Sequence, residues 1–277
     1  MPRSVRSLSP AGRGLFSRPA ITLGVCAVAI LAACDVTIKD GDVSFRQLHG
    51  RATREWSRTY SVERRVRVEV INGNGDIVVM AGPSGQVAAT ATIAARALTD
   101  QRARRLLDAT QIEESATREH IRFTTVRSNQ GGGLQVQYKI TVPADTRVEM
   151  TANNGTVKAD GVSGHVKAIV VNGGVELTGA KGSVDAASVN GSITAKMAEV
   201  TGRVRLECTN CRIALEVPRN TKATLNARSV NGGITVTGLD TPEVSGRRIR
   251  NLESSLNGGG PEIDVRVTNG RITIEGK

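Results

Sequence analysis

A Cys-x-x-Cys pair is the strongest candidate for side-chain chemistry in the sequence. Cys208 and Cys211 enclose Thr209-Asn210 and lie between two segments of alternating apolar residues, 204–206 and 213–215. Redox enzymes of the thioredoxin type place such a pair at a helix N-terminus, where the helix dipole lowers the thiol pKa. Because strand-like segments flank the pair here, we expect a structural disulfide formed in an oxidising compartment. Two free or metal-linking thiols are the alternative, and redox catalysis is a weaker one.

The other ionisable residues show no spacing typical of catalysis or metal binding. The three histidines lie in different segments, with no Cys or carboxylate at ligand spacing. Hydrolysis of a glycosidic bond requires two carboxylates that converge on one cleft, whereas Asp145, Asp160 and Asp185 fit turns or outward strand positions. We therefore expect no catalytic residue, no metal and no cofactor. A polysaccharide-active enzyme is the least favoured function.

A cysteine at the end of the N-terminal apolar segment indicates a lipid attachment site. Residues 1–33 contain four Arg and no acidic residue, and the run from Ile21 to Ala33 is apolar, which is typical of a signal peptide. The run ends in Leu31-Ala32-Ala33-Cys34, which resembles the lipobox of bacterial lipoproteins. The resemblance implies lipidation of Cys34 and an exported, membrane-anchored protein that faces the periplasm or the cell surface. An ordinary signal peptide with an incidental cysteine is the alternative.

The composition of the chain after the leader indicates which partners it attracts and where its folded domain begins. Removal of the leader leaves 33 basic residues against 26 acidic ones. Such a surface attracts anionic envelope polymers or lipid headgroups weakly, while the export signal argues against nucleic acid as a partner. Residues 34–61 are rich in Arg, Gly and Ser and are predicted to be a tether. Residues 62–277 are predicted to be the folded domain.

A repeat between about residues 153 and 237 must position all these groups. Its Asn-Gly pairs at 154, 172 and 190 are equally spaced, and alternating apolar and polar residues follow each pair, which predicts a half-buried strand after a tight turn. Ordering the backbone costs roughly 1–2 kcal/mol per residue, on the order of 20–30 kcal/mol for one unit of the repeat. The few inward side chains of one unit cannot offset this cost, so the units must stack. We predict an all-β fold of stacked repeats resembling a β-solenoid or β-helix. A β-sandwich of hairpins is the alternative, because Asn-Gly also favours hairpin turns.

One short helix is predicted outside the repeat, over roughly residues 100–109. Thr99 suits its N-cap, since a Thr side chain can accept a hydrogen bond from the first turn. Ala103, Leu106 and Leu107 would form its apolar face.

The outward positions of the repeat are the candidate binding face. Alternation places polar and charged side chains there, and this face is predicted to consist of Lys158, Lys167, Glu176, Asp185, Thr194 and Arg205. We predict that a non-enzymatic protein uses it for adhesion, or to bind an envelope protein or an anionic polymer.

The order of these motifs resembles the bacterial putative-adhesin, or toastrack-type, β-repeat family. Val142-Pro143 leads to Asn154-Gly155, and the same order recurs from Val217-Pro218 to Asn231-Gly232, followed by Gly-Gly-Gly-Pro and a terminal Val-Thr-Asn-Gly-Arg-Ile-Thr-Ile. The similarity covers roughly residues 60–277. It implies a repetitive all-β domain exposed outside the cytoplasm, with no catalytic residues. Since toastrack domains resemble sensory modules of some membrane proteins, an accessory role in envelope-stress sensing or signalling is the alternative function.

Overall fold

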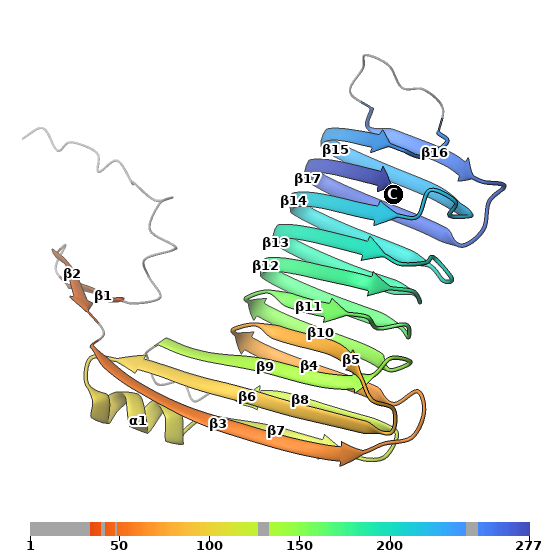
Figure 1. The fold of residues 1–277 in the computed structure, drawn as a ribbon. Coiled ribbons are helices and arrows are strands. Elements are labelled where there is room, and N and C mark those ends of the chain that lie inside the picture. The colour runs from red at the N-terminus through yellow and green to blue at the C-terminus, as the bar shows by residue number, and fades with distance from the viewer. Residues whose placement is uncertain (1–33, 40–41, 48, 127–132, 242–248) are drawn as a thin grey trace, which may run out of the picture.

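The computed structural model describes residues 34–39, 42–47, 49–126, 133–241 and 249–277, and strands dominate it (Figure 1). The N-terminal strands and the helix are β1 (Cys34–Lys39), β2 (Asp42–Gln47), β3 (Gly50–Ser61), β4 (Arg67–Asn74), β5 (Ile77–Gly82), β6 (Gln86–Ala97), α1 (Asp100–Asp108), β7 (Gln111–Ala116), β8 (His120–Val126) and β9 (Gly133–Pro143). The strands of the repeat and the C-terminal part are β10 (Arg147–Asn154), β11 (Val157–Asp160), β12 (Val166–Ala180), β13 (Val184–Met197), β14 (Val204–Val217), β15 (Ala223–Thr237), β16 (Asn251–Leu256) and β17 (Glu262–Gly276).

The repeat forms flattened coils, each built from one long strand that bends at an Asn-Gly corner. In β12 the first arm covers residues 166–170 and the second arm residues 175–178, with the corner at Asn172-Gly173 between them. Successive coils pair in parallel and in register, so that Asn172 lies opposite Asn190. Neighbouring strands of a hairpin would run antiparallel. The stacked-repeat prediction is therefore confirmed, and the sandwich of hairpins is wrong.

Apolar side chains of the two arms fill the space between them. At the first inward position of the second arm, one branched residue from each coil joins a continuous column, at most 6% exposed, made of Val157, Val175, Ile193, Ile213, Ile272 and Ile234. Burying such a side chain contributes roughly 1.5–3 kcal/mol. Each coil adds only a few of these residues, so the core exists only where coils lie against one another.

The coils do not follow one another in sequence order at the C-terminal end. The second-arm sheet runs β15-β17-β14-β13-β12-β11-β5-β9-β6-β3, which places the last strand of the chain, β17, between β14 and β15 (Figure 1). The antiparallel strand β16 covers the first arm of β15. At the other end, β4 and β5 form a coil that pairs in register with β10 and β11, although these strands follow much later in the chain.

A ladder of asparagine side chains runs along the corners. Each asparagine donates a hydrogen bond from Nδ2 to Oδ1 of the asparagine on the next coil toward the N-terminal end of the stack, and Asn74 is the final acceptor. The N···O distances are 2.6–3.1 Å. From the C-terminal end of the stack, the members are Asn231, Asn269, Asn210, Asn190, Asn172, Asn154 and Asn74. Because every rung is identical, the ladder fixes the register of all the coils at once.

Glycine follows most ladder asparagines because the next coil leaves no room for a Cβ atom. Gly191 has φ +144°, a conformation that side-chain-bearing residues rarely adopt, and a Cβ atom there would overlap the carbonyl oxygen of Gly173. Gly270 makes the same close approach to the carbonyl oxygen of Cys211. The Asn-Gly pair is therefore a stacking element as well as a turn.

The predicted helix is confirmed. It covers Asp100–Asp108, and Thr99 caps it by accepting a hydrogen bond from the backbone N–H of Arg102. Its apolar side chains, Ala103, Leu106 and Leu107, are buried. The helix packs on β3 and β6 at the N-terminal end of the stack (Figure 1).

The segment predicted to be a tether, residues 34–61, contains three strands. β1 and β2 pair with each other, whereas β3 pairs with β6 along its whole length and forms an edge of the main sheet. Trp56 packs edge-on against Phe123, with 5.4 Å between ring centroids. The apolar residues of β3 that contact the core, Ala52, Trp56 and Tyr60, recur at every fourth position. This spacing lacks the alternation by which a strand is recognised, which is why β3 was not predicted from the sequence. Because β3 pairs with β6, the folded domain extends to include it.

We predict that Gly191→Ala destabilises the fold by about 2–4 kcal/mol, because the new methyl group adds backbone strain to a clash with the neighbouring coil. Urea unfolding followed by circular dichroism measures the change. Gly73→Ala is the matched control, since a Cβ atom at this corner meets nothing within 4 Å and should change stability by less than about 0.5 kcal/mol. Equal midpoints for the two variants would show that coil contact at residue 191 is unimportant.

Candidate functional site

The outward side chains form two faces, one on each arm of the coils. Lys167, Asp185 and Arg205 lie in register on the first arm, which we term the first-arm face. The remaining candidates, Lys158, Glu176 and Thr194, lie in register on the second arm, which we term the second-arm face. The predicted single binding face is therefore wrong. The Asn-Gly corner folds each coil back on itself, so the buried core separates the two rows.

Ion pairs between neighbouring coils neutralise most charges of the second-arm face. The Lys158 ammonium lies 2.7 Å from the Glu176 carboxylate, and this hydrogen bond raises the pKa of Lys158. Glu216 contacts both Lys277, at 3.0 Å, and Lys196, at 3.3 Å. The hydrogen bond from Lys277 is the main reason that the pKa of Glu216 is lowered. Such exposed pairs add little stability, but each carboxylate compensates the charge of the lysine that it contacts.

The first-arm face shows the same compensation beside the N-terminal coils. Burial alone would raise the pKa of Glu149, but hydrogen bonds from Arg67 and Arg147 outweigh it, and the pKa is lowered. His165 is half-buried in the turn before β12, where its Nδ1 lies 2.7 Å from Ser183 Oγ. Burial is the main reason that the pKa of His165 is lowered, because burial disfavours the charged imidazolium.

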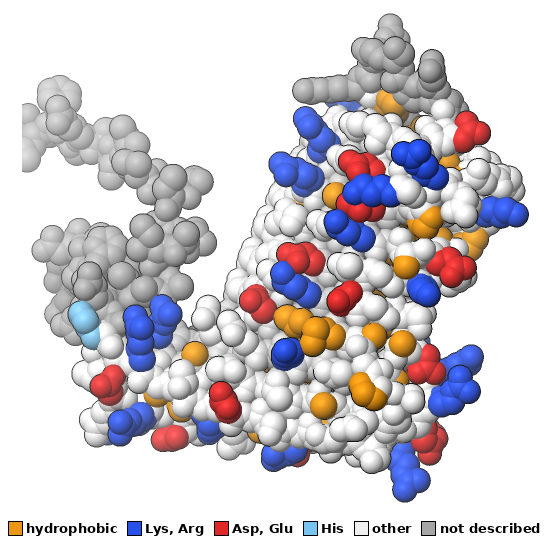
Figure 2. Space-filling view, viewed as in Figure 1, with side chains coloured by type: hydrophobic (Ala, Val, Ile, Leu, Met, Phe, Trp, Pro, Cys, Tyr) orange, Lys and Arg blue, Asp and Glu red, His pale blue; other side chains and the backbone are white. Residues whose placement is uncertain are grey.

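Exposed aliphatic side chains interrupt the first-arm face near the corner. A groove of about 420 Å³ lies there. Ile169, Val171, Val189 and Val230 line it and are 37–51% exposed. In the space-filling view, charged side chains of both signs and small groups of apolar side chains are scattered over the surface of the stack (Figure 2).

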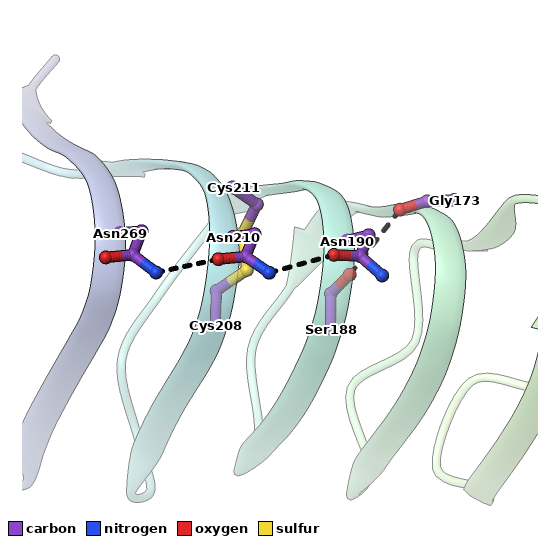
Figure 3. Close-up of a disulfide and its surroundings, with 7 residues drawn as sticks. All are labelled: Gly173, Ser188, Asn190, Cys208, Asn210, Cys211 and Asn269. Carbon is purple, nitrogen blue, oxygen red and sulfur yellow. Dashed lines mark hydrogen bonds between the residues drawn. A yellow bond between two sulfur atoms is a disulfide. The ribbon is translucent and has the colours of Figure 1, made fainter. Parts of the chain in front are cut away.

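Cys208 and Cys211 are joined by a disulfide at the corner of β14, with 6.0 Å between their Cα atoms. Figure 3 shows the bond beneath Asn210 of the asparagine ladder. Cys211 occupies the register position that Gly191 and Gly270 occupy on the neighbouring coils. Both cysteines are buried and lie within a strand. The pair therefore braces a corner, and it lacks the helix N-terminus that redox catalysis would use.

Two arginines directly follow the corners of β14 and β17. Arg212 and Arg271 are register partners on the second-arm face and line a groove of about 1040 Å³ together with the asparagine ladder. Neither residue is among the predicted site residues, because an isolated outward Arg is common in strands. Arg212 follows Asn210 in the sequence by the same interval as Arg271 follows Asn269, and this shared spacing is the signal that could have identified them.

Cys34, the predicted lipidation site, is the first residue of β1. The predicted signal peptide, residues 1–33, lies outside the described residues. No helix in the described ranges is long and apolar enough to cross a membrane. Within the same part of the chain, no group of three or more His, Cys, Asp or Glu residues is placed to hold a metal ion.

Several solved structures are similar to this chain. A putative cell adhesion protein from Clostridium sporogenes shares 12% identity over 81% of this chain and 100% of its own, with a TM-score of 0.48. A putative adhesin from Bacteroides fragilis shares 12% identity over 81% of this chain and 97% of its own, with a TM-score of 0.26. A putative adhesin from Parabacteroides distasonis shares 14% identity over 83% and 98%, with a TM-score of 0.25.

No curated protein matches the chain. A family model does match, and it covers residues 68–275, which include every coil of the stack. The family is described as Toastrack DUF4097, in agreement with the stacked coils and with the order of the Val-Pro and Asn-Gly motifs. The chain therefore belongs to the toastrack family DUF4097.

Proposed function

We propose that the protein is a non-enzymatic, membrane-anchored envelope lipoprotein that presents its coil surfaces for adhesion or for binding an envelope protein or polymer. One observation carries this proposal. The two arms enclose the aliphatic core, and long ladders of polar side chains cover both outer faces. A flat, repetitive surface of this kind suits contact with an extended partner. The resemblance of the motif order to the bacterial putative-adhesin family supports the same role.

The anchor is proposed from the lipobox-like sequence before Cys34. A single acyl chain binds membranes only weakly, so stable anchoring requires more than one, which is what lipidation of a lipoprotein cysteine supplies. Gly50, the first residue of β3, follows Cys34 closely in the sequence. A fully extended chain between these two residues spans at most roughly 55 Å. The N-terminal end of the stack would therefore lie near the membrane, and the C-terminal coils would lie farther from it.

We predict that cells expressing the full chain place it in the membrane fraction, and that an alkyne analogue of palmitate labels it. Cys34→Ser should abolish the label and release the protein from the membrane, because no acyl acceptor remains at the lipobox. Cys26→Ser, inside the leader, is the matched control and should be labelled normally. An unlabelled wild-type protein would refute the anchor.

We predict that Cys208 and Cys211 resist alkylation in protein purified from the envelope until a reductant is added, since an oxidising compartment preserves disulfides. Mass spectrometry of the peptide that contains both residues reports their state. Reduction should lower the free energy of unfolding by ~2 kcal/mol, the loop-closure term for so short a loop. Complete alkylation without reductant would contradict both the disulfide and the exported location.

We predict that envelope fragments bind the purified protein through its charged rows. One variant replaces Lys167, Asp185 and Arg205 by Ser, and a second replaces Lys158 and Glu176 by Ser and Thr194 by Ala. Combining both sets should reduce the bound fraction several-fold, because the polar contacts of both faces are lost, while the separate variants identify the face in use. Unchanged binding in the combined variant, with an unchanged unfolding midpoint, would count against the proposal.

A further inference from the structure

The second-arm face carries a pair of like charges that the fold itself does not explain. Arg212 on β14 and Arg271 on β17 are Cα partners in a parallel pairing, so they project from the same position of adjacent coils. Neighbouring strands lie about 4.8 Å apart. Like charges held directly opposite one another across a sheet destabilise it.

Neither guanidinium is neutralised. Both side chains are exposed, and neither forms an ion pair with any described residue. Several other charges on the coils are compensated by a neighbour, for example Lys158 by Glu176 at 2.7 Å and Arg266 by Asp264 at 2.8 Å. Among the parallel pairings of the described coils, Arg212 with Arg271 is the one like-charge pair in which neither member has such a partner. An external anion would supply the missing charge.

The surroundings of the pair are open and rich in hydrogen-bonding groups. In the same row, the positions on either side of the pair hold the small residues Ser192 and Gly233, which leave both guanidinium groups accessible. The groove of about 1040 Å³ is far larger than a single ion. Amides of the asparagine ladder and the Thr235 hydroxyl line it and suit sugar hydroxyl groups.

The local backbone is well suited to hold the two side chains in place. The Cys208–Cys211 disulfide ends at the residue before Arg212, and Gly270, before Arg271, is packed against the carbonyl of Cys211. The backbone directly before each arginine is therefore held in place. A guanidinium donates two parallel hydrogen bonds to one carboxylate or phosphate. Two guanidinium groups one strand spacing apart can hold a single oxyanion between them, or two successive ones along a polymer.

The place of the groove in the sheet distinguishes a polymer from a lipid. The order of strands sets β14, β17 and β15 at one end of the stack and β3, the strand of this sheet that follows Cys34 most closely in the sequence, at the other (Figure 1). A protein anchored through Cys34 would hold this groove away from the membrane surface. The sequence has no aromatic residue after Tyr138, so recognition there would rely on charge and hydrogen bonds and not on sugar stacking.

We propose that this groove, the Arg212–Arg271 clamp, binds the carboxylate groups of an acidic polysaccharide. The inference rests on the proposed surface role and names its partner, but it does not require the lipid anchor. Each arginine donates to a carboxylate oxygen, and the asparagine ladder contacts the neighbouring sugar hydroxyl groups.

The test uses the purified full chain in detergent of neutral headgroup, titrated with polygalacturonate. We expect binding that weakens with added salt, because exposed charges are screened. Arg212→Gln with Arg271→Gln should reduce the affinity by roughly tenfold or more, since two charge-assisted contacts are lost. Arg212→Lys with Arg271→Lys should also weaken binding, because Lys keeps the charge but not the fork geometry.

A matched control removes the same charge from the same face. Lys196→Gln with Lys277→Gln takes away two cations that already share the Glu216 carboxylate, and it should leave the affinity within about twofold of wild type. The Arg212→Gln, Arg271→Gln variant should unfold at or above the wild-type midpoint, since it loses a repulsion. A weaker affinity with this midpoint supports a binding role and excludes misfolding.

The clamp would be overturned if the wild type did not bind polygalacturonate, if the Arg212→Gln, Arg271→Gln variant bound it equally well, or if the wild type bound neutral dextran equally well. Tighter binding to vesicles that contain phosphatidylglycerol than to polygalacturonate would also overturn it, in favour of a lipid headgroup. Binding of envelope fragments that survives the double arginine substitution would refute the clamp and leave the proposed surface role intact. Binding of polygalacturonate without any binding of envelope fragments would support the clamp and refute the proposed surface role.

Discussion

Each coil of this protein must superimpose on its neighbour at the corner, and the rest of the structure depends on that contact. At the corner the backbone of one coil meets the carbonyl of the next so closely that Gly173 and Gly191 cannot carry a side chain. The adjoining asparagine closes a side-chain hydrogen bond to the same neighbour. The close backbone contact and the side-chain hydrogen bond therefore both favour the same register between neighbouring coils. Once that register is set, inward aliphatic residues align in columns and outward charges meet their partners.

The asparagine spacing is what made the fold predictable. A tight-turn pair that recurs at a constant interval, with alternation after it, leaves stacked strands as the arrangement that buries enough apolar surface. The helix could also be predicted from the sequence, because Thr99 is a favourable N-cap residue and the apolar residues of α1 recur with helical periodicity. The parts that could not be predicted lack such local signals. Apolar residues of β3 recur at every fourth position, and the alternation of β17 would fit against any coil as well as against β14 and β15.

The candidate site was only partly within reach of the sequence. Residues before an Asn-Gly pair lie on one arm and residues after it on the other, so the split between Lys167 and Lys158 was encoded, although alternation alone does not show it. The disulfide partners were suggested by their spacing. Arg212 and Arg271 are far apart in the sequence and become neighbours only because β17 adds directly to β14. Long-range strand order, and not local chemistry, creates that pair.

The position of β17 has a consequence for how the molecule is assembled. β14 and β15 are consecutive in the chain, yet each makes a long parallel contact with β17, which is synthesised after both of them. Until that segment arrives, the distal coil has no inner neighbour and its aliphatic column is incomplete. Completion of the distal coils therefore waits for β17, so a chain that lacks β17 would display an open hydrophobic seam that quality-control proteases recognise.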